Sequence, residues 1–123
     1  MSEPSTPTLR ELQILKSLWE HGPCSVREVH RYLNEPDLAY NTVQTLLRIM
    51  EDKGLVGHHV DGRMFVYAAL YTREDSAVGF LDRVFDGAAS AMVQSLLRAE
   101  RIPPGELERM RTLIEQARRQ ARG

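Results

Sequence analysis

The stretch NTVQTLLRIM, at positions 41–50, carries side chains suited to reading nucleic-acid bases. Its polar residues are spaced i, i+3, i+4 and i+7 and so share one face of a helix: Asn41, Gln44, Thr45 and Arg48. In the DNA major groove, Asn and Gln amides match adenine, Arg matches guanine, and Thr hydrogen-bonds or contacts the thymine methyl. Residues 38–50 contain no carboxylate, a group that phosphates would repel. The pattern predicts a DNA-reading face; plain solvent exposure is the alternative.

The segments before this stretch predict two further helices. S/T-x-x-E capping boxes begin at Thr8 and at Ser25, and they predict helices over about 9–21 and 26–34. The polar stretch itself lies in a third helix, over about 40–53. Apolar residues recur at helical spacing in all three, so each helix is expected to bury one face in a shared core.

A β-hairpin is predicted to follow the third helix. The run LVGHHVDGRMFVYAAL contains Asp61-Gly62 between β-rich segments, a pair typical of a type I′ turn. Arg63 comes just after this pair, where a cation could reach a phosphate; a solvated turn residue is the alternative. Three short helices and a hairpin are the order of a winged helix, in which the third helix enters the major groove. The predicted DNA-binding residues are Asn41, Thr42, Gln44, Thr45, Arg48 and Arg63.

The remaining chain predicts three helices, over about 73–87, 89–100 and 105–120. Fifty residues form only a thin core by themselves, so pairing with a second copy is the expected way to bury their apolar faces; packing within one chain is the alternative. The predicted dimer-interface residues are Phe80, Leu81, Val84, Phe85, Leu96, Leu97, Leu107, Met110, Leu113 and Ile114.

Charge, cysteine content and hydropathy limit the possible partners and location of the protein. The 123 residues have a net charge of −1, so any case for DNA depends on where charges lie rather than on their sum. The single cysteine, Cys24, is expected to be a structural filler rather than a redox switch, and it excludes an internal disulfide. Without a long apolar run or a signal peptide, the protein is predicted to be cytoplasmic and not inserted in a membrane.

Catalysis is not expected, and neither is a metal site or a cofactor. The sequence has no Gly-rich phosphate loop, no G-x-S-x-G or H-E-x-x-H motif and no Cys/His cluster. His58 and His59 are adjacent, so on a strand they would point to opposite faces rather than toward one metal ion. The near-neutral charge leaves one other function class open, a winged-helix module that docks on protein instead of DNA.

Three segments together resemble the BlaI/MecI/CopY family of bacterial transcriptional repressors, also called penicillinase repressors. They are LRELQILKSLWEHGPCSVREVHRYL, YNTVQTLLRIMEDKGLV and DGRMFVYAAL, and the resemblance covers about residues 8–118. It implies a mostly helical α+β protein: a flexible segment over 1–8, a winged helix-turn-helix domain over 9–71 and a three-helix dimerisation domain over 72–123. It further implies a homodimeric repressor that binds a two-fold symmetric double-stranded DNA operator.

The sequence departs from the family pattern in three places. Ile49 stands where the best-studied members have an Arg in the recognition helix, with Arg48 one position earlier. Penicillinase-type members are cleaved at an Asn-Phe bond, and the matching position here is approximately Ser95-Leu96. A membrane sensor-protease and a ligand are therefore both open as the releasing partner. The cysteine-rich copper site of other members is not present in the C-terminal sequence EQARRQARG.

Overall fold

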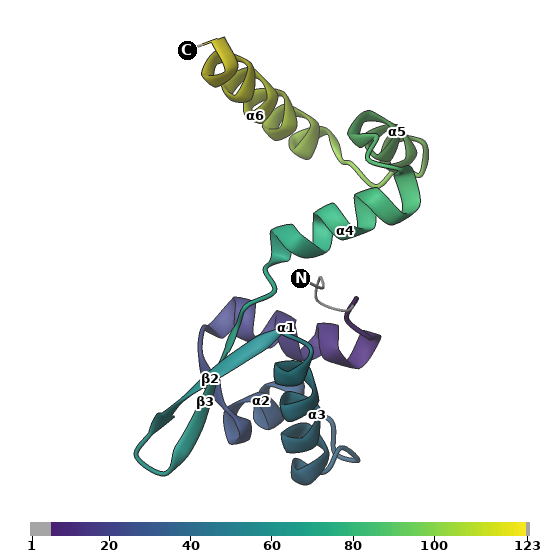
Figure 1. The fold of residues 1–123 in the computed structure, drawn as a ribbon. Coiled ribbons are helices and arrows are strands. Elements are labelled where there is room, and N and C mark those ends of the chain that lie inside the picture. The colour runs from purple at the N-terminus through teal and green to yellow at the C-terminus, as the bar shows by residue number, and fades with distance from the viewer. Residues whose placement is uncertain (1–5, 123) are drawn as a thin grey trace. The chain divides into compact units, whose positions relative to one another are not determined.

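The structure is a computed structural model that describes residues 6–122, so the first five residues of the predicted flexible segment lie outside the described residues. The chain divides into two compact units, the first ending at Gly79 and the second beginning at Phe80. The elements, labelled in Figure 1, are α1 (Leu9–His21), β1 (Cys24–Ser25), α2 (Val26–Leu33), α3 (Tyr40–Asp52), β2 (Val56–Asp61), β3 (Met64–Ala69), α4 (Arg73–Phe85), α5 (Ala89–Arg98) and α6 (Pro104–Arg122). All six predicted helices are confirmed, with ends that differ by at most two residues.

Both predicted capping boxes are present. The Thr8 hydroxyl accepts a hydrogen bond from the Glu11 N–H at 3.2 Å, and the Glu11 carboxylate accepts one from the Thr8 N–H at 2.9 Å. Ser25 and Glu28 repeat this arrangement, with distances of 3.2 and 2.9 Å. The bond from the Ser25 N–H lowers the pKa of the Glu28 carboxyl. Because these bonds satisfy free N–H groups of each first turn, α1 and α2 begin where the sequence predicts.

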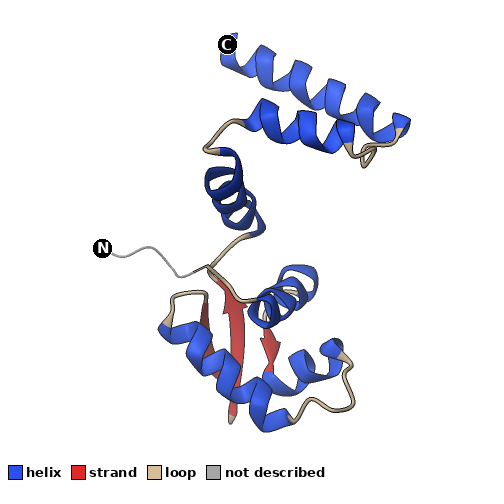
Figure 2. Ribbon diagram, turned by 90° about the vertical axis from the view of Figure 1, so that its right-hand side faces the viewer, coloured by secondary structure: helices blue, strands red, loops and turns tan. Residues whose placement is uncertain are grey.

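The sheet has one strand more than the predicted hairpin. It has three antiparallel strands in the order β1-β3-β2, because Cys24 and Ser25 pair with Tyr67 and Val66 of β3. The sheet also lies beside the helices of the first unit (Figure 2). Two residues are too few to show a period, so β1 was not predicted.

The turn of the hairpin lies one residue later than predicted. Asp61 belongs to β2 and pairs with Met64, which leaves Gly62 and Arg63 as the two-residue loop. Gly62 has a φ of 65°, and Arg63 is not among the residues with positive φ. A single glycine at the first loop position fits a type II′ turn, so the predicted type I′ turn at Asp61-Gly62 is wrong.

The core of the first unit holds α3 against α1, α2 and the sheet. Val43, Leu47 and Met50 of α3 are each 0% exposed, so the helix has a fully buried face. Around them pack Ile14, Leu15, Leu18, Cys24, Val26, Val29, Leu55, Val56, Tyr67 and Tyr71. Because interiors are closely packed, this contact fixes the rotation of α3 about its axis. It therefore decides which α3 side chains face outward.

The helices of the C-terminal part have no buried residue. This holds for every described residue of α4, α5 and α6. Leu113 is 60% exposed and Ile114 is 55% exposed, although both lie in the apolar stripe of α6. All ten predicted interface residues are exposed or half-buried in the single chain. None of the helices within residues 6–122 has the length and apolar character needed to cross a membrane.

Candidate nucleic-acid interface

The outward face of α3 carries the predicted reading residues. Asn41, Thr45 and Arg48 are exposed, Thr42 is exposed beside them, and Gln44 is half-buried. They lie opposite the buried face of the helix, so α3 presents amide, hydroxyl and guanidinium groups on a backbone that cannot rotate freely. The other elements of the first unit leave the side chains of Asn41, Thr45 and Arg48 exposed to solvent.

Two polar contacts hold the C-terminal end of α3. Just after the helix, the Lys53 ammonium donates a hydrogen bond to the Glu11 carboxylate at 2.8 Å. Glu11 is 2% exposed. Burial would raise the pKa of its carboxyl, but hydrogen bonds from Lys53 and from the Thr8 N–H outweigh that effect and lower it. The carboxylate thus stays ionised and joins the start of α1 to the end of α3.

The second contact joins α3 to the hairpin. His58 Nδ1 lies 2.7 and 2.8 Å from the two carboxylate oxygens of Glu51. The His58 ring stacks on the Phe65 ring with centroids 4.1 Å apart, which places His58 between α3 and the paired strand. His59 follows His58 in β2, and successive side chains of a strand alternate between the two faces of the sheet. No group of three or more potential metal-binding side chains is found within residues 6–122.

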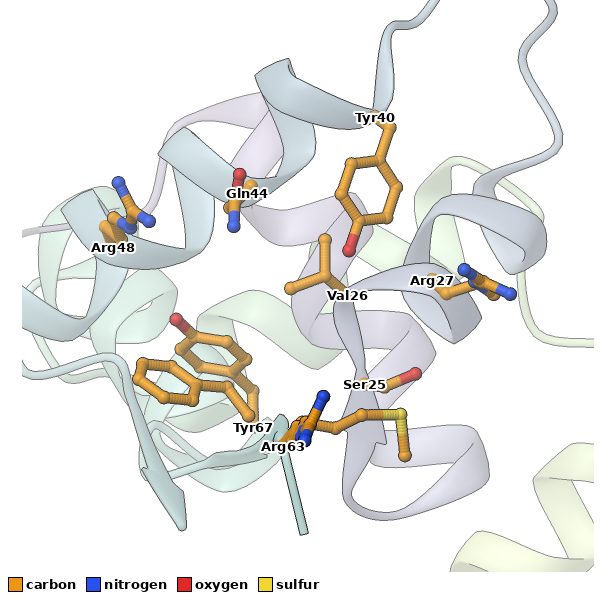
Figure 3. A pocket seen from close by; sticks show the side chains of 10 residues that line it. Ser25, Val26, Arg27, Tyr40, Gln44, Arg48, Arg63 and Tyr67 are labelled. Atoms are coloured by element: carbon orange, nitrogen blue, oxygen red, sulfur yellow. The ribbon is translucent and has the colours of Figure 1, made fainter. Parts of the chain in front are cut away.

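A groove of about 500 Å³ lies between α3, the N-terminal end of α2 and the hairpin (Figure 3). We call it the arginine groove, and it is lined by Ser25, Val26, Arg27, Tyr40, Gln44, Arg48, Arg63, Met64, Phe65 and Tyr67. The lining includes three arginines and no carboxylate. In Figure 3, Gln44 and Arg48 extend from α3, and Arg63 lies across the hollow from them. The groove thus gathers three positively charged side chains in a chain whose net charge is −1.

The structure brings together only part of the predicted site. Gln44, Arg48 and Arg63 line the arginine groove, whereas Asn41, Thr42 and Thr45 are exposed on α3 outside it. Sequence reasoning did not predict Ser25, Val26, Arg27, Tyr40, Met64, Phe65 and Tyr67 as part of a site. These residues come from three separate segments, and only the tertiary packing makes them neighbours. The sequence offers one indication of these residues: Arg27 lies within the capping box formed by Ser25 and Glu28.

Two buried groups of this region remain protonated. Burial raises the pKa of the Tyr67 phenol, which forms part of the groove wall, so its hydroxyl stays neutral at physiological pH. Burial likewise raises the pKa of the Cys24 thiol, which is 1% exposed and donates to the Gly22 carbonyl at 3.2 Å. A protonated, buried thiol is a poor nucleophile, as expected of a structural filler.

The order of α1, α2, α3 and a hairpin, with a hydrogen-bonding outer face on α3 and a carboxylate-free groove beside it, defines a winged-helix DNA-binding protein. In this class α3 is the recognition helix, and β2, β3 and their turn form the wing.

Comparisons with known proteins give the family. The family model described as penicillinase repressor matches residues 7–116. The penicillinase repressor of Bacillus licheniformis is 28% identical over 111 residues, which cover 86% of this chain and 87% of that protein. The transcriptional regulator BlaI of Mycobacterium tuberculosis (strain H37Rv) is 31% identical over 109 residues, 85% of this chain and 79% of that protein.

A solved structure is similar to part of this chain. It is the solution structure of monomeric Bacillus licheniformis BlaI in complex with the blaP half-operator, 30% identical, with a TM-score of 0.51. The match covers 61% of this chain and 93% of that one. The chain belongs to the penicillinase repressor family. It is therefore a DNA-binding transcriptional repressor, and the family is one of repressors rather than enzymes.

Proposed function

We propose that the repressor acts in the cytoplasm as a homodimer on a two-fold symmetric operator, with α3 in the major groove and the wing on the sugar–phosphate backbone. The supporting observation is the outward face of α3, fixed by a fully buried opposite face. Bacillus licheniformis BlaI, 30% identical, has been studied bound to a half-operator. A half-operator implies a second half, and hence a second protomer, for the complete site.

The positions of the α3 side chains suggest which of them contact bases and which contact phosphates. Asn41, Thr42 and Thr45 face outward beyond the groove and contact base edges. Gln44 and Arg48 stand at the border of the arginine groove, where they reach bases from one side and phosphates from the other. Arg63, on the wing turn, neutralises a phosphate. Contacts to phosphates position the protein, and contacts to base edges give specificity.

The proposed dimer depends on the C-terminal helices, over 72–123, and leaves residues 9–71 to bind DNA. Phe80, Val84 and Leu97 are 45%, 54% and 45% exposed, so their apolar side chains are left partly in water in the single chain. Burying such area against an identical surface is favourable by roughly 25 cal/mol per Å². A symmetric dimer would also place two recognition helices about 34 Å apart, one turn of DNA.

Operator titrations test this function. Full-length protein is titrated against labelled DNA flanking its own gene at several salt concentrations. Gln44→Ala and Arg48→Ala should each cost about 1–3 kcal/mol of specific binding. Gln13→Ala and Lys16→Gln, exposed on α1 outside the groove, are matched controls that should leave binding unchanged. If both groove variants bind the specific DNA as tightly as the unmodified protein, the proposed reading face is wrong.

A further inference from the structure

We propose that the arginine groove is also a binding site for a small aromatic carboxylate, and that a bound acid and operator DNA exclude one another. The second part rests on the proposed function; the first part does not. The groove volume, about 500 Å³, lies within the range of about 300–1,000 Å³ typical of small-molecule sites. It is therefore large enough for an aromatic ring system that carries an acid group.

The three arginines of the groove favour binding of an anion. None of Arg27, Arg48 and Arg63 forms an ion pair with a carboxylate in the part of the chain that the structure describes. Elsewhere in the same unit, Arg10 and Lys53 are both paired with glutamates. Guanidinium groups bind carboxylates through two parallel hydrogen bonds, and this geometry gives specificity as well as affinity. In Figure 3 the Arg63 guanidinium lies at the hollow, where such a pair could form.

The remaining lining residues favour binding of an apolar, planar group. Tyr40, Phe65 and Met64 line the groove while remaining 42%, 45% and 54% exposed, and Val26 and the buried Tyr67 complete the wall. The Phe65 ring is held in place by its stack on His58. Aromatic side chains pair favourably with aromatic ligands in offset or edge-to-face contacts. Inorganic phosphate would satisfy the arginines but leave this apolar wall in water, so an aromatic acid fits the whole lining better.

Exclusion of DNA follows from shared residues. Gln44, Arg48 and Arg63 line the groove and are also proposed DNA contacts. A bound carboxylate would neutralise positive charge at these residues and block the approach of the DNA sugar–phosphate backbone. For one competing site, a ligand at ten times its dissociation constant weakens DNA binding about 10-fold. The groove would then let a small metabolite release the operator without cleavage of the chain.

Calorimetric titration of the full-length protein with 1-naphthoate, without DNA, tests the binding site. The neutral 1-naphthamide, which has the same ring system, is the ligand control. We expect naphthoate to bind at least ~10-fold more tightly than the amide, because a hydrogen-bonded ion pair contributes that much. Arg63→Gln and Phe65→Ala should each weaken naphthoate binding by a similar factor, while Lys16→Gln should not.

Thermal unfolding and circular dichroism establish that each variant is folded, and Arg63→Gln alters an exposed turn position. Equal affinity for naphthoate and naphthamide would overturn the proposal. So would unchanged naphthoate binding by both Arg63→Gln and Phe65→Ala.

A second titration, of operator DNA at increasing naphthoate, tests exclusion. We expect the apparent dissociation constant for DNA to rise in proportion to naphthoate, and a constant value would overturn mutual exclusion. The two proposals fail separately. Absence of specific DNA binding without naphthoate would contradict the proposed function, whereas DNA binding without any naphthoate binding would contradict only the ligand site.

Discussion

Replacing Glu11 by glutamine should lower the free energy of unfolding by about 1.5–3 kcal/mol at neutral pH, the usual value of a hydrogen bond to a charged group. Glu11 is 2% exposed and accepts bonds from Lys53 at 2.8 Å and from the Thr8 N–H at 2.9 Å. Glutamine keeps an oxygen for the Thr8 N–H, so the capping box survives and only the charged bond is lost. Because the Lys53 side chain is 30% exposed, water recovers part of its solvation, and the lower end of the range is expected.

The effect should depend on pH with a definite sign. Folding lowers the pKa of Glu11, so its contribution is fully present above the pKa of the unfolded carboxyl, about 4.3. The contribution is lost as pH falls through the lower pKa of the folded state. Urea unfolding followed by circular dichroism should therefore show a constant difference between the two proteins near pH 7 and a shrinking one below about pH 4.3.

Lys53→Met provides the matched comparison. This variant leaves the Glu11 carboxylate buried without its partner, which is more costly than removing the charge itself. It should be less stable than Glu11→Gln at pH 7. The reasoning is refuted if Glu11→Gln is as stable as the unmodified protein at pH 7, if the difference does not change with pH, or if Lys53→Met is the more stable variant.

Three further outcomes are expected. Leu47→Ala, at a position that is 0% exposed, should cost about 2–5 kcal/mol in urea unfolding, and a cost under about 1 kcal/mol would contradict its place in the core. Arg63→Gln should reduce the slope of log affinity against log salt by about 0.9 per protomer, measured by DNA titration, whereas Lys16→Gln should leave it unchanged. Leu113→Glu should convert the protein to monomers in sedimentation experiments, and a persistent dimer would remove Leu113 from the interface.

Local signals were sufficient to predict the helices and the face of α3. Capping boxes at Thr8 and Ser25 depend on residues three positions apart, and both the caps and the helix starts are found as predicted. The periodicity of α3 likewise separates Val43, Leu47 and Met50 from the polar residues opposite. Such features are readable because the interacting groups are close in sequence.

Features that depend on tertiary contacts could not be predicted. β1 consists of two residues whose strand character comes only from pairing with Tyr67 and Val66. The turn at Gly62 and Arg63 was placed one residue early because Asp61-Gly62 is a common turn pair, but cross-strand register decided the outcome. The arginine groove combines Arg27, Arg48 and Arg63 from three segments, and no spacing in the sequence relates them.

Selection of binding sites from a random DNA library, with the unmodified protein and with Arg48→Ala, tests the central claim most directly. The fixed outer face of α3 predicts an enriched sequence motif, and the proposed homodimer makes this motif two-fold symmetric. The variant should lose preference at one symmetric pair of positions and keep the rest. No enriched motif, or the same motif from both proteins, would contradict base reading by this face of α3.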